Sequence, residues 1–114
     1  MRVPNRGVAT AIIALAIIAT ASARAAELPT FAVTLAAGRI EPARLEIPAK
    51  TRVKLTLRNA GSGAAEFEGR DVRVEKVLAP GAESFVVLPA LASGTYRFFD
   101  DFHPDAPDML IVVK

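Results

Sequence analysis

Apolar side chains recur at every second position along much of the chain. Residues 31–35 and 53–57 alternate apolar side chains with polar, charged or small neighbours. Because successive side chains of a strand point to opposite faces, this period predicts half-buried β-strands. Further strands are predicted near residues 45–47, 65–68, 74–78, 84–88, 95–99 and 109–113.

Turn-forming residues separate these predicted strands. Glycine, asparagine and proline gather at residues 59–63, 80–81 and 93–94, where the backbone conformations of turns favour them. Seven or eight short strands with such spacing predict an all-β fold, in which two antiparallel sheets pack as a Greek-key β-sandwich. Residues 69–73 are the one short stretch where a helical turn is considered.

The N-terminus has the pattern of an export signal. Arg2 and Arg6 precede an uncharged run from Val8 to Ala21, and small residues follow at Ala23-Arg24-Ala25. This order predicts a signal peptide over residues 1–25, cleaved after Ala23 or Ala25, and a mature domain over residues 26–114. The apolar run is shorter than the roughly 20 residues of a membrane span, so an uncleaved anchor is the weaker alternative. We expect a periplasmic protein whose mature chain does not insert into the membrane.

Composition narrows the function classes. A chain of 114 residues has room for one core, and its lack of cysteine excludes disulfides, thiol catalysis and cysteine-ligated metals. The formal charge of +2 falls by three, to −1, when the arginines of the predicted signal peptide are removed. A nucleic-acid-binding function therefore loses its electrostatic basis, and no nucleic-acid partner is expected.

The first group of candidate ligands surrounds the single histidine. Asp100, Asp101 and His103 lie in an acidic segment that runs from Phe98 to Asp108. An imidazole and several carboxylates together supply the nitrogen and oxygen ligands of a divalent metal site. The alternative is a solvated acidic turn that carries a surface histidine.

The second candidate group is a pair of glutamates. Glu66 and Glu68 are two positions apart, so a strand places both on one face while Phe67 points into the core. Two adjacent carboxylates repel each other unless a positive charge lies between them. A metal ion supplies that charge in one interpretation. In the other it comes from nearby basic side chains, namely Arg70, Arg73 and Lys76.

Met109 is the remaining candidate ligand. It begins the last predicted strand, where a core position is the simpler interpretation and a soft thioether ligand the alternative. Hydrolytic or nucleophilic catalysis has no support, because the lone histidine lacks an evident serine partner and no phosphate-binding glycine loop is present.

The order of these segments is similar to that of a known family. The matching segments are residues 31–35, 40–49, 53–59, 65–68, 79–81, 93–98 and the acidic loop to His103. Over essentially the whole mature chain, the sequence resembles the EfeO-type cupredoxin-like domains of bacterial periplasmic iron-uptake systems. The resemblance implies a cupredoxin-like β-sandwich.

The sequence departs from blue-copper cupredoxins at nearly every ligand. Those proteins use two histidines, one cysteine and usually a weak axial methionine. The first histidine corresponds to about Ala65 or Glu66 and the cysteine to about Asp100, while His103 retains the second histidine. The axial methionine is absent and Met109 is offset from its place, so a blue-copper electron carrier is not expected.

The Glu-Phe-Glu and Phe-Phe-Asp-Asp-Phe-His segments look like those of the subgroup that accompanies Ftr-type iron permeases. That resemblance implies a periplasmic accessory protein that binds or oxidises iron, with copper as a further ion, for membrane or periplasmic components of an iron-uptake system. Its implied metal ligands are Glu66, Glu68, Asp100, Asp101, His103 and, as a soft outlier, Met109. A ferroxidase activity is left open.

Two other functions stay open at this point. One is a metal-free periplasmic module that contacts another protein through its acidic side chains. The other is a periplasmic copper carrier that depends on His103 and Met109 and not on the glutamates. Relative affinity for Cu(I) and Fe(II) separates the copper carrier from an iron-binding protein, because a thioether ligand favours Cu(I).

Overall fold

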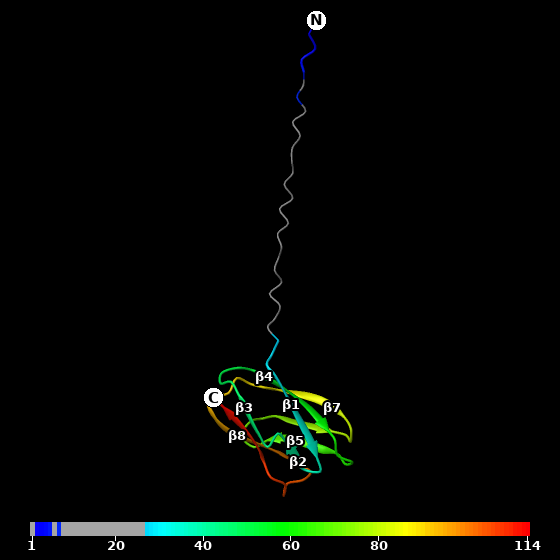
Figure 1. The fold of residues 1–114 in the computed structure, drawn as a ribbon, viewed down its shortest axis with the longest axis vertical. Coiled ribbons are helices and arrows are strands. Elements are labelled where there is room, and N and C mark those ends of the chain that lie inside the picture. Colours follow the sequence, from blue (N-terminus) through cyan, green and yellow to red (C-terminus); the bar gives the residue numbers. More distant parts are fainter. Residues whose placement is uncertain (1, 6, 8–26) are drawn as a thin grey trace.

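The computed structural model describes residues 2–5, 7 and 27–114, and all of its strands lie between Thr30 and Val113 (Figure 1). The strands are β1 (Thr30–Ala36), β2 (Arg39–Glu41), β3 (Arg44–Ile47), β4 (Val53–Asn59), β5 (Ala65–Gly69), β6 (Glu75–Leu78), β7 (Glu83–Leu88), β8 (Gly94–Asp100) and β9 (Met109–Val113). No helix in the described residues is long and apolar enough to cross a membrane. The apolar run of the predicted export signal and its cleavage positions lie outside the described residues.

The strands form two sheets, which confirms the predicted all-β sandwich. One sheet has the order β2-β1-β4-β7 and the other the order β3-β9-β8-β5-β6. The expectation of purely antiparallel sheets is wrong, because β1 pairs with β4, and β3 with β9, in parallel. Each parallel pair is joined by chain that crosses to the other sheet, so the second strand enters in the same direction as the first.

Two local predictions are also corrected. β2 is a ninth strand that the hydrophobic pattern does not reveal, since its three residues contribute one buried side chain, Ile40. The considered helical turn at residues 69–73 is absent. The Arg70 amide instead donates to the Arg97 carbonyl at 2.9 Å, and the Asp71 carboxylate accepts from the Arg97 amide at 3.2 Å. Residues 70–72 form bends in the connection between β5 and β6, which the Gly69 amide closes by donating to the Val74 carbonyl at 2.9 Å.

The core lies between the two sheets and follows the alternation of the strands. Val53, Leu55 and Leu57 of β4 are at most 1% exposed, as the sequence pattern predicts. Phe67 of β5 and Phe98 of β8 stack in the facing sheet, with ring centroids 5.2 Å apart. Burying large apolar side chains of this kind contributes roughly 1.5–3 kcal/mol for each one.

One end of the sandwich brings together two connections. The loop between β8 and β9 lies there beside the turn between β1 and β2, at the end away from the start of β1 (Figure 1). Gly38 in that turn has a φ of +84°, and a Cβ built on it would lie 2.5 Å from the His103 Cβ. Glycine is therefore required at this position both by the left-handed backbone and by the close approach of the histidine.

Candidate metal centre

Three carboxylates meet on the outer face of the five-stranded sheet. Glu66 and Glu68 lie on β5 with Phe67 buried between them, which confirms their predicted shared face. Asp101 follows β8, and its amide donates to the Glu66 carbonyl at 2.9 Å. Each side chain offers one oxygen, and the three oxygens lie within 4.8 Å of one another. We call Glu66, Glu68 and Asp101 the carboxylate trio.

The trio is not neutralised by a basic side chain. In the described part of the chain, no salt bridge involves any of its three members. Partial burial, together with the negative charges of Asp101, Glu68 and further acids, raises the pKa of Glu66 above its ordinary value. The trio therefore holds like charges whose repulsion a bound cation would relieve.

Arg70 and Lys76, two of the basic residues near the trio, are directed elsewhere. The Arg70 guanidinium donates to both carboxylate oxygens of Asp108, at 2.7 and 3.0 Å, and its central carbon lies 3.8 Å from the centre of the Phe99 ring. The hydrogen bonds between Arg70 and Asp108 raise the pKa of Arg70 and lower that of Asp108. Lys76 pairs in register with Phe67, so alternation directs it away from the glutamates.

Asp100, although adjacent to Asp101, points to the inside. Its side chain is fully buried. Oδ1 accepts hydrogen bonds from the amides of Glu66 and Phe102, both at 3.0 Å, and Oδ2 lies 2.9 Å from Nδ1 of His103. The carboxylate is thus engaged by three partners within the chain.

His103 covers Asp100 at the end of the sandwich. Its side chain is 39% exposed, and its Cβ packs against the Gly38 turn. Among the described residues, the one group of three or more metal-ligating acids or histidines is the trio, and His103 is not a member of it. The six predicted ligands are therefore divided: three form the trio, Asp100 and His103 form a separate pair, and Met109 belongs to neither.

Met109 is a core residue. It is 1% exposed and lies in the apolar cluster between the sheets. In that place its thioether contributes to packing, and nothing in its surroundings directs it towards the trio on the outer face.

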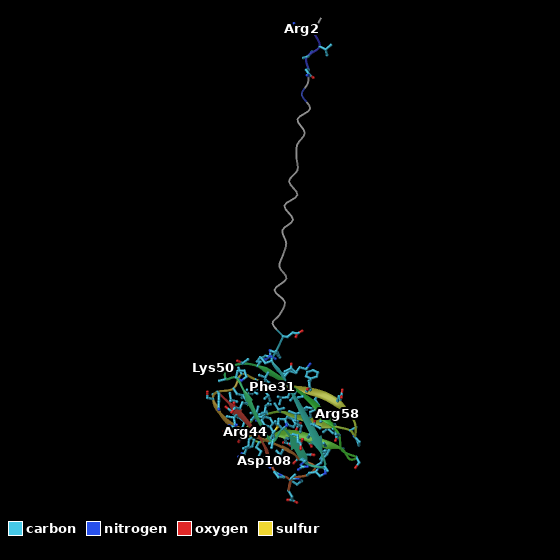
Figure 2. All side chains as sticks on the ribbon, viewed as in Figure 1. Arg2, Phe31, Arg44, Lys50, Arg58 and Asp108 are labelled. Atoms are coloured by element: carbon cyan, nitrogen blue, oxygen red, sulfur yellow. The ribbon has the colours of Figure 1, made fainter. Side chains whose placement is uncertain are left out.

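The contact between Arg70 and Asp108 was not foreseen from the sequence. The two residues are 38 positions apart, and they meet because Phe98 of β8 pairs with Gly69 of β5 on one side and with Met109 of β9 on the other. Asp108 also lines a groove of about 680 Å³ between residues 37–43 and 106–108, at the end of the domain opposite Lys50 (Figure 2). No local motif marks either feature.

The protein is thus a two-sheet β-sandwich that carries side chains able to ligate a metal at the end of β8 and in the loop that follows. The model of the cupredoxin-like domain matches residues 8–113. The chain therefore belongs to the cupredoxin-like domain family. The EfeO-type subgroup within that family remains a prediction.

One relative and several solved structures are similar to the chain. Uncharacterized protein RP394 of Rickettsia prowazekii (strain Madrid E) is 32% identical over 82 residues, which are 72% of this chain and 66% of the relative, just under two thirds of its length. The purple cupredoxin of Nitrosopumilus maritimus has a TM-score of 0.55 at 21% identity, over 73% of this chain and 98% of its own. Reduced auracyanin from Roseiflexus castenholzii has a TM-score of 0.64 at 16% identity, over 75% and 96%.

A third solved structure, a copper-binding protein in its apo form, has a TM-score of 0.62 at 14% identity, over 75% of this chain and 86% of its own. At these identities the solved structures establish the fold alone. A blue-copper centre does not fit the residues of this chain. Cysteine is absent, Met109 is buried in the core, and Asp100 is already engaged by His103 and two backbone amides.

Proposed function

We propose that this protein is an exported metal-binding accessory protein that holds iron as its cargo for a membrane permease. The observation that carries the proposal is the carboxylate trio, whose three oxygens lie within 4.8 Å of one another. Carboxylate oxygens are hard ligands that suit Mn(II), and a given site generally binds Fe(II) more tightly than Mn(II). Water completes the coordination of an ion at the protein surface.

The charge balance of the trio supports this assignment. The trio has no salt-bridge partner among the described residues, and the neighbouring Arg70 is committed to Asp108. An ion that binds the folded state supplies the missing positive charge and stabilises the fold by mass action. The proposed export to the periplasm places such a protein where a permease would receive the ion.

The proposal concerns binding and delivery. Oxidation of the bound Fe(II) would need an electron acceptor from outside the chain, since carboxylates bind the ion without accepting its electron. A copper carrier that depends on Met109 is less well supported, because that thioether is 1% exposed.

Anaerobic calorimetric titration with Fe(II), Mn(II) and Cu(II) tests the proposal. We expect one Fe(II) per chain, and we expect the double variant Glu66→Gln, Glu68→Gln to bind it at least about 100-fold more weakly, since even a partner outside the ligand set is worth 10–100-fold. The matched control is Glu46→Gln, which removes an acid paired with Lys114 and Arg44 far along the same sheet. Equal Fe(II) affinity of the double variant and the wild type would overturn the proposal.

A protein-interaction module is the second candidate. Val77 is 58% exposed and pairs in register with Glu66, so an apolar side chain lies directly beside the trio. A basic partner with an apolar contact would suit that surface. Absence of binding for all three metals would favour this candidate over metal delivery.

A further inference from the structure

The pair formed by Asp100 and His103 occupies the place where the family pattern would put a cysteine and its neighbouring histidine. The Asp100 side chain is fully buried, whereas the His103 side chain is 39% exposed. Their contact joins Oδ2 of the aspartate and Nδ1 of the histidine at 2.9 Å. The two ring nitrogens of the histidine therefore have different surroundings.

The hydrogen-bond partners of Asp100 decide which nitrogen carries the hydrogen. Two backbone amides, from Glu66 and Phe102, donate to Oδ1, so the carboxylate is held as an acceptor. An ionised carboxylate has no hydrogen to donate, and its contact with Nδ1 is a hydrogen bond only if Nδ1 is the donor. In neutral His103 the free lone pair then lies on Nε2.

We infer that Asp100 is a positioning residue and not a metal ligand: it fixes His103 in the Nδ1–H tautomer and presents Nε2 as the nitrogen that takes a borderline divalent ion such as Cu(II). The inference rests on the proposed metal-binding function for the source of the ion. In this arrangement the buried carboxylate of Asp100 holds the Nδ1 hydrogen, and Nε2 of His103 is left open on the outer side.

The composition of the pair argues against Asp100 as a ligand. In the part of the chain that the structure describes, no third acid or histidine joins Asp100 and His103. An ion bound to Oδ2 of Asp100 would have to reach a fully buried oxygen and displace the contact with Nδ1 of His103 from it. A carboxylate that orients a ligating histidine through its other ring nitrogen is, by contrast, a common arrangement in metal sites.

The nitrogen site and the carboxylate trio are separate. Asp101 contributes its oxygen to the trio, while Asp100 points inside and His103 packs on the Gly38 turn. Fe(II) is a borderline ion that oxygen ligands can hold, whereas an imidazole attracts Cu(II) more strongly. Asp100 reaches the trio through its charge and through the Glu66 amide, but a change at Asp100 removes none of the three oxygens of the trio.

The tautomer of His103 in metal-free protein is the first test. Long-range ¹H–¹⁵N correlation spectra at about pH 8, above the ordinary imidazole pKa of about 6.5, identify the nitrogen that carries the hydrogen. We expect Nδ1–H in the wild type. In Asp100→Asn the amide can still accept from both backbone amides and now offers N–H to His103 Nδ1, so the hydrogen should move to Nε2.

Cu(II) binding is the second test. Line broadening of the His103 ring signals should appear in the wild type and require at least about tenfold more Cu(II) in Asp100→Asn, the range found for partners that orient a ligating histidine. Asp105→Asn is the matched control, because it removes an exposed carboxylate two residues from His103 that belongs neither to the trio nor to the Asp100–His103 pair. It should leave the tautomer and the broadening unchanged.

The outcomes separate this inference from the proposed function. An Nε2–H tautomer in the wild type, or a tautomer that Asp100→Asn does not change, would overturn the inference whatever the trio binds. Loss of Fe(II) binding in Asp101→Asn with an unchanged His103 tautomer supports both. Absence of Fe(II) binding in the wild type would remove the proposed function, and the tautomer result would still decide the role of Asp100.

Discussion

Asp100 and Asp101 are neighbours with identical side chains, and the fold gives them opposite surroundings. Asp100 is buried and is met by two amides and an imidazole. Asp101 lies with two glutamates and forms no salt bridge with any described residue. The inner carboxylate is balanced within the chain and holds structure together. The outer one lacks such a balance, which is the condition that favours a ligand from outside.

The largest expected effect on stability comes from removing the buried carboxylate of Asp100. Asp100→Ala leaves two backbone amides and the His103 Nδ1 hydrogen without their acceptor. We expect a loss of about 3 kcal/mol in the free energy of unfolding, because buried donors without partners cost roughly 1–3 kcal/mol each and part of this cost is relieved by water. Urea denaturation measures it. If Asp100→Ala and Asp101→Ala lower the free energy of unfolding by equal amounts, the proposed difference between the two aspartates is contradicted.

A smaller loss is expected where His103 packs on the turn between β1 and β2. In Gly38→Ala the new Cβ would approach the His103 Cβ to 2.5 Å, and alanine would be forced into a backbone with φ near +84°. We expect a loss of about 2 kcal/mol, within the cost of a strained backbone position. Gly81→Ala is a suitable control in thermal denaturation, since that glycine also has a positive φ of +74° but an open space around it. Equal losses would mean that the contact with His103 adds nothing.

Neutralising the outer site should have the opposite sign. Glu66→Gln and Asp101→Asn each remove one of the repelling charges, so we expect metal-free protein to melt at a higher temperature. Lower melting temperatures in both variants would contradict the proposed repulsion within the trio.

The pH dependence of stability sharpens the same contrast. Since the pKa of Glu66 is raised from 4.5, the folded state binds its proton more tightly than the unfolded chain does. The stability of the wild type relative to Glu66→Gln should therefore fall as pH rises from about 4.5 through the raised pKa. The pKa of Glu46 is lowered from 4.5 by Lys114 and Arg44. The stability of the wild type relative to Glu46→Gln should therefore rise with pH between the lowered pKa and about 4.5. Thermal melts from pH 3 to 7 compare the two slopes, and slopes of the same sign would contradict this contrast.

The smallest expected effect belongs to the ion pair beside the trio. The pKa of Asp108 is lowered by Arg70, so this pair stabilises the fold above the ordinary aspartate pKa and is lost as pH falls through the lowered one. We expect Asp108→Asn to cost less than about 1 kcal/mol at neutral pH, the usual range of accessible ion pairs. Urea denaturation at pH 7 and at successively lower pH checks that the difference from the wild type shrinks once the pH falls below 3.8.

The alternation of apolar residues along the sequence was enough to predict much of the fold and part of the site. Alternation alone located most strands and placed Glu66 and Glu68 on one face, because a strand fixes the directions of its own side chains. The three residues of β2 were too short to show a period. The parallel pairings depend on which strands cross between sheets, which no local pattern encodes.

The division of the six predicted ligands into separate groups could not be predicted either, because it also depends on strand pairing. Asp100 and Asp101 are indistinguishable in the sequence, and their directions follow from the register of β8 against β5 and from the end of β8 at Asp100. The burial of Met109 agrees with the simpler of its two interpretations, a core position at the start of the last strand. The pairing of His103 with Asp100 follows from a turn in which the His103 amide donates to the Asp100 carbonyl at 2.9 Å.

The most direct test of the account compares Fe(II) binding by Asp100→Asn and Asp101→Asn in anaerobic calorimetric titrations of metal-free protein. The account predicts near wild-type affinity for Asp100→Asn and a loss of at least about tenfold for Asp101→Asn, because only the second variant removes an oxygen of the trio. Wild-type affinity in Asp101→Asn, or a larger loss in Asp100→Asn, would contradict it.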